Sequence, residues 1–364
     1  MKQDDMRAAR LLHHRKASLG QGDAIVAPIV SSATFNLPEV VAGGFSYARA
    51  DSPTWRDLEA QLEILEDAPV VSFPSGMAAI SAGLMACGGG KVVLPSDGYY
   101  VTRAFAEGFL APLGVQVQTI LTRDYASADF AGAGVVFVET PANPSLDLID
   151  IADVVARAHR GGAKVVVDNT TMTPYLQRPL DFGADLVVAS DTKAPNGHSD
   201  VLFGHVAGRN ADLMARVRDW RRMSGAVPGA FEAWLVHRGI ETLELRLSRM
   251  CASAGIIAGR LKGHKALVSL RYLGLSDDPD HALAGRQMTG FGFLIGMTFK
   301  DAETAEKFLA RCPLIAQSTS FGGVHTSGER RARWGDAVAP GFVRLSVGIE
   351  PVEVLWAAIA VALE

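Results

Sequence analysis

The chain has only three cysteines, Cys87, Cys251 and Cys312, spread over its 364 residues. An odd number of distant cysteines argues against a disulfide framework, and their spacing matches no metal-ligand pattern. We therefore expect no metal site. The three thiols are interpreted as small apolar side chains that pack in the interior.

The sequence also lacks an excess of either charge and any long apolar run. Its formal net charge is -4, so no basic character suggests a nucleic-acid partner. No apolar stretch approaches the roughly 20 residues that cross a bilayer, and the N-terminal segment lacks the apolar core of a signal peptide. We expect a cytoplasmic protein without a membrane partner.

Short apolar runs and helical patterns alternate regularly from residue 54 to residue 189. Runs typical of buried strands occur at 70–73, 91–95, 134–138, 164–167 and 185–189. Helical spacing lies between them or precedes them, as at Leu58, Leu62 and Leu65. This alternation predicts βαβ units, and therefore an α/β fold with a mostly parallel sheet between helices.

The pattern changes on either side of this region. Residues 1–50 are irregular after one short helical pattern, and we interpret them as an arm that contacts a neighbouring subunit. Residues 51–235 form the expected α/β domain. A long helical region, about 212–262 and broken near 224–228, leads into a smaller α+β domain that we place at 236–364.

Lys193 occupies an unusual position for a lysine. It follows a buried strand and two hydroxyl residues, Ser190 and Thr192, and precedes a run of turn formers at 195–198. A partly desolvated amine is neutral enough to form a Schiff base with an aldehyde. Pyridoxal phosphate needs such an amine, a phosphate site beside it and a carboxylate for its ring nitrogen.

Polar residues at other expected strand ends provide candidates for those two groups. Asp168 ends one strand and would keep a pyridine nitrogen protonated. Gly76 and Met77 lie where a strand turns into a helix, and a helix N-terminus binds phosphate. Tyr99 follows a third strand and could stack on a planar ring. Arg344, in a late strand, suits bidentate binding of a substrate carboxylate.

Taken together, these stretches resemble the Cys/Met metabolism family of pyridoxal-phosphate enzymes, which includes cystathionine γ-lyase, cystathionine γ-synthase, cystathionine β-lyase and methionine γ-lyase. The resemblance covers residues from about 27 to 350. It rests on the combination of YARADSPT, SGMAAI, ETPANP, VVVDNTTMTPYLQRPLDFGADLVVAS, TK followed by NGHSD, TSFGGV and VRLSVGIE. It implies the type I fold of pyridoxal-phosphate-dependent transferases, with a sheet of the seven-stranded type.

The resemblance also implies roles in cofactor binding. Lys193 would be the Schiff-base lysine and the general base, Asp168 would face the pyridine nitrogen, and Tyr99 would stack on the ring and assist catalysis. The other residues expected around the phosphate and the ring oxygen are Gly76, Met77, Ser190, Thr192 and Asn143.

The substrate and the oligomer follow from the same resemblance. Ser320 and Arg344 would bind the carboxylate of an amino-acid substrate, with Asn143 beside it. Tyr47 and Arg49 would reach the cofactor phosphate from a neighbouring subunit, so a dimer would be the smallest active unit. The family usually forms a homotetramer, built as a dimer of such dimers.

Several positions depart from the family pattern. Two small residues usually follow the tyrosine, where this chain has Tyr100 and Val101. Methionine γ-lyases resemble one another in having cysteine at the position of Val101, which makes that activity less expected. Ala194 stands where an aromatic residue is common, and Thr319 stands where many γ-lyases and γ-synthases have an acid. The TKA form and the segment TSFGGVHTSGERRARWG look most like a bacterial branch labelled cystathionine γ-lyase.

We therefore expect γ-elimination of L-cystathionine to cysteine, 2-oxobutanoate and ammonia, a transsulfuration step in cysteine and methionine metabolism. Cystathionine γ-synthase and cystathionine β-lyase stay open as alternatives, because their chemistry diverges only after a shared intermediate. A cofactor-binding regulator without turnover is less expected, since groups for both cofactor and substrate are present. A nicotinamide dehydrogenase is disfavoured because no GxGxxG follows the first strand.

Overall fold

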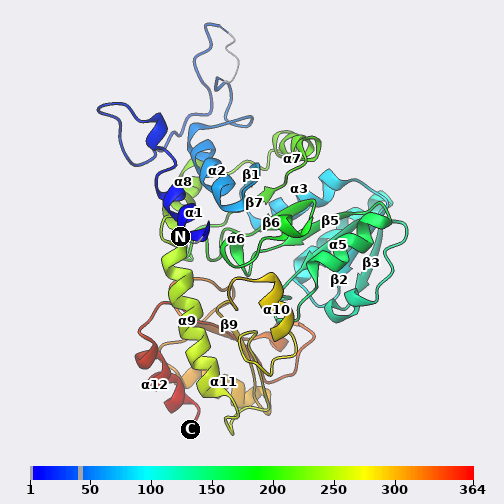
Figure 1. Ribbon diagram of the computed structural model, residues 1–364, viewed down its shortest axis with the longest axis vertical. Helices are drawn as coiled ribbons and strands as arrows, with labels where there is room; N and C mark the ends of the chain where they lie inside the picture. The colour runs from blue at the N-terminus through cyan, green and yellow to red at the C-terminus, as the bar shows by residue number, and fades with distance from the viewer. Residues whose placement is uncertain (1–2, 40–43) are drawn as a thin grey trace.

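The computed structural model describes residues 3–39 and 44–364. Residues 1–2 and 40–43, which belong to the expected arm, lie outside the described residues. The rest of the arm contains helix α1 (Gln3–Leu12) and loops that extend from one end of the molecule (Figure 1). Helix α1 packs against α2 (Pro53–Glu66), so the arm is attached to the body at its start.

A seven-stranded sheet forms the centre of the larger part of the molecule. Its strand order is β1-β7-β6-β5-β4-β2-β3. The strands are β1 (Val70–Phe73), β2 (Lys91–Pro95), β3 (Gln116–Ile120), β4 (Ala133–Glu139), β5 (Lys164–Asp168), β6 (Leu186–Ala189) and β7 (Gly204–Ala207). Strand β7 is antiparallel to both neighbours and the other described pairs are parallel, which confirms the expected mostly parallel sheet.

Apolar side chains on both faces of the sheet hold helices against it. Along β5, Val165 and Val167 point into one buried apolar layer and Val166 points into the other. Such a strand is apolar at every position because both of its faces are covered. Helices α3 (Gly76–Cys87), α4 (Tyr100–Phe105) and α7 (Ala211–Ser224) lie on one face, and α2 and α5 (Ile151–Arg160) lie on the other.

The direction of the strands brings distant residues to one edge. Because β2, β4, β5 and β6 are parallel, their carboxyl ends lie at the same edge of the sheet. Strand β1 points the same way, since it is separated from β6 by the antiparallel β7. The segments that follow these strands therefore surround a single region, where ligands bind in such folds.

Local side-chain caps define where several helices begin. The hydroxyl of Ser75 accepts a hydrogen bond from Ala78 N at 3.1 Å at the start of α3. Asp150, Asn210 and Asp301 cap α5, α7 and α11 (Ala302–Arg311) in the same way. These caps satisfy backbone N–H groups that have no partner within the helix, so they stabilise the helix ends.

A five-stranded sheet, in the order β10-β11-β12-β9-β8, forms the centre of the C-terminal part. Its strands are β8 (Ser269–Arg271), β9 (Leu294–Thr298), β10 (Ala316–Gln317), β11 (Ser327–Arg330) and β12 (Phe342–Ser346). Helix α9 (Leu243–Leu261) leads into this part, and α11 and α12 (Val352–Ala362) pack beside it (Figure 1). The remaining helices are α6 (Thr173–Leu176), α8 (Ala230–Ile240) and α10 (His281–Gln287).

The boundary expected at residue 236 falls within α8, so the division of the chain at that point stays a prediction. Across residues 3–39 and 44–364, none of the helices combines the length and the apolar character that crossing a membrane requires.

Candidate active site

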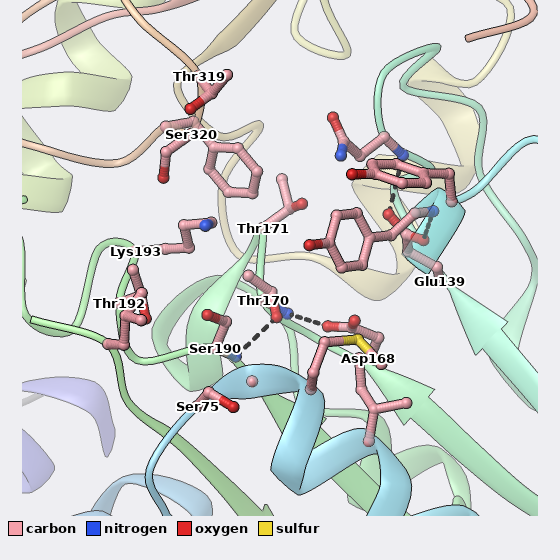
Figure 2. A pocket seen from close by; sticks show the side chains of 18 of the residues that line it. Ser75, Glu139, Asp168, Thr170, Thr171, Ser190, Thr192, Lys193, Thr319 and Ser320 are labelled. Carbon is pink, nitrogen blue, oxygen red and sulfur yellow. Dashed lines mark hydrogen bonds between the residues drawn. The ribbon is translucent and has the colours of Figure 1, made fainter. Parts of the chain in front are cut away.

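A cavity of about 660 Å³ lies at the carboxyl edge of the large sheet, and residues of the C-terminal part, among them Arg344 of β12, line its other side. It is lined by every residue expected at the site except Tyr47 and Arg49. Figure 2 shows the Lys193 side chain entering the open centre from one side, while Asp168 and Glu139 lie on the other. The structure therefore brings together residues that are separated by up to 268 positions, from Gly76 to Arg344.

Lys193 is held on a loop that its neighbours fix by hydrogen bonds. Thr192 Oγ1 accepts a hydrogen bond from Phe203 N at 2.9 Å, and Gly197 N donates to Lys193 O at 2.8 Å. From α9, Arg246 donates to the carbonyl oxygen of Ala194 at 2.6 Å and to that of Pro195 at 3.1 Å. The backbone around the lysine is thus fixed independently of its side chain.

The Lys193 amine lies in an environment that favours its neutral form. Desolvation, together with the nearby Arg344 guanidinium, lowers the pKa of Lys193 to about 8, while Asp168 opposes the shift. Its Nζ lies 5.4 Å from the centre of the Phe321 ring. A fraction of the amine is therefore unprotonated near neutral pH, as a nucleophile or general base requires.

Asp168 is a buried carboxylate at the end of β5. It accepts a hydrogen bond from Thr170 N at 3.0 Å. Desolvation nevertheless raises the pKa of Asp168, although Thr170 and Lys193 oppose the shift. A carboxylate whose charge is destabilised in this way gains from a cationic partner in the cavity, and the protonated nitrogen of pyridoxal phosphate would provide one.

The N-terminus of α3 provides the candidate phosphate site. Gly76 and Met77 begin this helix at the cavity wall, and Ser190 and Thr192 line the wall beside them. Free N–H groups and the helix dipole favour an anion at this position. A side chain at Gly76 would fill the space, because its Cβ would lie 2.6 Å from Ser190 Cβ. The anionic end of the expected cofactor therefore fits here.

Replacing Gly76 with alanine is expected to weaken the binding of pyridoxal phosphate about tenfold or more, because the added Cβ pushes Ser190 from the phosphate site. The dissociation constant is measured by titrating the apoprotein with the cofactor and following its absorbance. Gly259→Ala, in α9, is the matched control, since nothing lies within 4 Å of the added Cβ. Equal affinities of the two variants would contradict this location for the phosphate.

Glu139 organises the wall opposite Lys193, although its role was not predicted. It accepts hydrogen bonds from Tyr99 N at 2.6 Å and from Asn143 N at 3.1 Å. Burial, together with the charge of Asp168, raises the pKa of Glu139 to about 8. Burial also raises the pKa of Tyr99, so its phenol is protonated at neutral pH and can donate a proton. Glu139 thereby positions two of the expected site residues.

Arg344 projects from β12 into the cavity and is almost fully buried. Its guanidinium donates to Asn143 Oδ1 and, at 2.7 Å, to Ser320 O. Its Nε has no hydrogen-bond partner among the described residues. A buried donor of this kind suits a substrate carboxylate, which would accept from it. The structure thus places Arg344 and Ser320 together at the cavity wall, and their role in binding a substrate carboxylate stays a prediction.

Tyr47 and Arg49 lie outside the cavity of their own chain. Arg49 Nη1 donates weakly to Arg222 O at 3.4 Å, and its guanidinium carbon lies 5.6 Å from the centre of the Tyr47 ring. Tyr47 is 47% exposed. Their expected role at the site of a neighbouring subunit stays a prediction.

Several lining residues were not predicted, among them Thr170, Thr171, Arg331 and Trp334. Thr170 directly follows Asp168-Asn169, and its Oγ1 accepts a hydrogen bond from Ser190 N at 2.9 Å. The sequence does contain a signal for Thr170, because a hydroxyl residue stands close to a carboxylate at the end of a predicted strand. Arg331 and Trp334 lie in an irregular segment whose sequence has no such signal.

Comparison with known proteins gives a consistent assignment. Residues 8–364 match the family described as "Cys/Met metabolism PLP-dependent enzyme". A Streptomyces coelicolor protein named "Putative cystathionine gamma-lyase" is 45% identical, covering 92% of this chain and 88% of that one. The L-methionine gamma-lyase of Pseudomonas putida is 36% identical, covering 98% of this chain and 97% of that one.

A solved structure is similar over almost the same length. Cystathionine gamma synthase from Xanthomonas oryzae pv. oryzae, in complex with cystathionine, has a TM-score of 0.91 and 32% identity, and the match covers 98% of this chain and 97% of that chain. The family match, the sequence identities and the fold thus agree over nearly the whole length of the chain. The chain belongs to the Cys/Met metabolism family of enzymes, which depend on pyridoxal phosphate.

Proposed function

We propose that this enzyme is a cystathionine γ-lyase. It takes L-cystathionine and one water to L-cysteine, 2-oxobutanoate and ammonia, breaking the Cγ–S bond and the bond between Cα and its nitrogen. The proposal of a reaction at the Cα of an amino acid rests on the position of Lys193 and Arg344, which both lie near the ring of Phe321. Lys193 Nζ lies 5.4 Å and the Arg344 guanidinium carbon 5.0 Å from the centre of Phe321.

Each proposed residue has a task that follows from its surroundings. Arg344 and Ser320 hold the substrate carboxylate, which orients Cα toward the amine of Lys193. Pyridoxal phosphate, when bound, supplies an electron-accepting ring joined to the substrate's amino group. Lys193 first removes the proton from Cα. It then removes a proton from Cβ, which allows the Cγ–S bond to break. Its pKa of about 8 places it near the range where a general base is most effective.

Loss of the Cγ–S bond leaves a thiolate that needs a proton. We assign this proton to the phenol of Tyr99, whose raised pKa keeps it protonated. Asp168 has the complementary task of holding the proton on the ring nitrogen, since a cation beside it offsets the cost of burying its charge.

The choice of a γ-lyase within the family rests on similarity. The relatives described above include proteins named as γ-lyases of cystathionine and of methionine and as a γ-synthase. The relative with 45% identity favours the cystathionine γ-lyase. Val101, where methionine γ-lyases have cysteine, favours it over the methionine enzyme. The γ-synthase and the β-lyase are the alternatives.

The homotetramer, built from active dimers, and a cytoplasmic location belong to the same proposal. The dimer would bring Tyr47 and Arg49 to the phosphate site of the partner. The described loops between α1 and α2 extend from the body in Figure 1, which supports a role of this arm at a neighbouring subunit.

The test is identification of the products. The holoenzyme is incubated with L-cystathionine, and the keto acid and the amino-acid thiol are identified by mass. 2-Oxobutanoate with cysteine supports the proposal. Pyruvate with homocysteine identifies a β-lyase and overturns it. If neither pair forms, and an activated homoserine ester with cysteine gives cystathionine, the enzyme is a γ-synthase.

A further inference from the structure

The segment from β11 to the turn after it lies at a wall of the cavity to which the proposed mechanism assigns no role. It consists of strand β11 and the short 3-10 turn η6 (Arg331–Trp334). Arg331 and Trp334 line the cavity together with Thr319 and Ser320. Trp334 is 55% exposed, an unusual state for so large an apolar side chain.

Glu329 fixes the wall and connects it to the substrate arginine. In the pairing of β11 with β12, Glu329 lies directly opposite Arg344, and its carboxylate is 3.7 Å from Arg344 Nη2. The same buried carboxylate accepts hydrogen bonds from the indole N–H of Trp334 and from Arg331 Nη1, the latter at 2.6 Å. One side chain thus positions both Arg344 and Trp334.

The charged side chains in this wall are paired with one another: Glu329 also lies 3.4 Å from Arg333 Nη2. Arg331 also donates to Asp336, at 2.7 Å from Nε and 2.6 Å from Nη2, so each of its nitrogens has a carboxylate partner. Thr319 brings no charge. A substrate passing this wall therefore meets the Trp334 indole beside arginines that are already paired with carboxylates.

We infer that Trp334 is a specificity-determining residue that contacts the half of the substrate beyond the reacting sulfur, and that Glu329 is the positioning residue that holds it. This rests on the proposed function. The substrates would be amino acids whose γ-substituent is a large thioether. Contact with the indole recognises this half, because the thioether and its methylene groups pack favourably on an aromatic ring, and the distal ammonium is attracted to the face of the ring. A tryptophan fixed by its N–H loses little rotamer freedom on binding.

The test compares two ligands on the holoenzyme. L-Cystathionine reaches the wall, whereas L-norvaline has the amino group, carboxylate and Cγ but no distal half. Trp334→Ala is expected to raise the KM for L-cystathionine about tenfold and to change the dissociation constant of L-norvaline less than about twofold. The norvaline constant is read from the cofactor absorbance and needs no turnover. Trp334→Phe, which keeps a ring but loses the N–H, should fall between wild type and Trp334→Ala.

The controls separate this role from loss of structure and from failure of the proposed function. Trp356→Phe, on α12 and outside the cavity, should change neither constant. Glu329→Gln should raise both, because Arg344 and Trp334 share that carboxylate. A Trp334→Ala variant that binds both ligands as wild type does, or weakens both equally, overturns the inference. If wild type does not turn over L-cystathionine, its calorimetric binding constant takes the place of KM.

Discussion

Replacing Lys193 with alanine is expected to abolish turnover of L-cystathionine and to leave the fold intact. Loss of a positioned general base alone lowers rates about 10²–10⁴-fold, and this amine would also hold the cofactor. Within the described part of the chain, its Nζ makes no hydrogen bond or ion pair, so alanine leaves no partner unsatisfied. Turnover and the cofactor absorbance are measured, with circular dichroism as the check on folding.

Lys300→Ala is the matched control, because that side chain is 73% exposed and lies outside the cavity. It should behave as wild type in every measurement. A Lys193→Ala enzyme that retains turnover would remove the lysine from the proposed mechanism altogether, whereas loss of secondary structure would show that the residue supports folding instead.

The pKa of Lys193 adds a pH dependence to this prediction. Desolvation and Arg344 place it at about 8, so the neutral amine becomes the main form above that pH. The rate at which the apoprotein captures pyridoxal phosphate should therefore rise through about pH 8. A free lysine would give the same rise near its ordinary pKa of about 10.4. Arg344→Leu should move the midpoint upward, because it removes a cation that disfavours the protonated amine.

The parts of the fold that the sequence predicts are those determined by local pattern. The run 91–95 is β2 and the helix expected at 151–160 is α5, because an apolar run or a capped amphipathic pattern is complete within a few residues. The break expected near 224–228 is also present. A second break, between α8 and α9, was not predicted.

Most of the structural features that the sequence did not predict depend on pairing between distant segments. Glu329 matters because the register of β11 and β12 sets it against Arg344, and nothing in SGERRARW indicates that register. Strands β10 and β11 are short and carry no regular alternation, so periodicity does not reveal them. Residues 201–203 are apolar in the sequence, yet β7 begins only at Gly204, and Leu202 lines the cavity instead.

Candidate site residues were predictable where a strand end placed them. Asp168 is the last residue of β5, whereas Tyr99 follows β2 and Asn143 follows β4. Parallel strands bring their carboxyl ends to one edge of the sheet. Glu139 also ends a strand, yet its task depends on hydrogen bonds to Tyr99 N and Asn143 N that exist only after folding. The role expected of Tyr47 and Arg49 involves a second chain, whose position one sequence does not predict.

Replacing His205 with leucine is expected to destabilise the protein by about 3–5 kcal/mol, the usual cost of removing one partner of a buried ion pair. His205 lies on β7 and is fully buried. Its Nδ1 lies 2.9 Å from both carboxylate oxygens of Asp191, and its Nε2 lies 3.0 Å from Glu66 Oε1. The variant leaves two buried carboxylates without a cation.

Burial alone would lower the pKa of His205, but Asp191 and Glu66 outweigh it and raise the pKa to about 10. The unfolded chain has a histidine pKa of about 6.5. The contribution of His205 to stability is therefore complete below about pH 6.5 and is lost as the pH rises toward about 10. The wild-type free energy of unfolding should fall over this interval by more than that of His205→Leu, as measured by urea denaturation at several pH values.

A second histidine and carboxylate pair provides the control. His159 Nε2 lies 2.8 Å from Asp185 Oδ2, but its side chain is 40% exposed, so His159→Leu should cost at most about 1 kcal/mol. Replacing Glu66, Asp191 and His205 together with apolar residues should recover most of the loss, because no charge is then left unpaired. Equal effects at His205 and His159 would show that the buried network contributes nothing beyond a surface pair. Asp191 is two residues before Lys193, so the buried network also ties the lysine loop to β7 and α2.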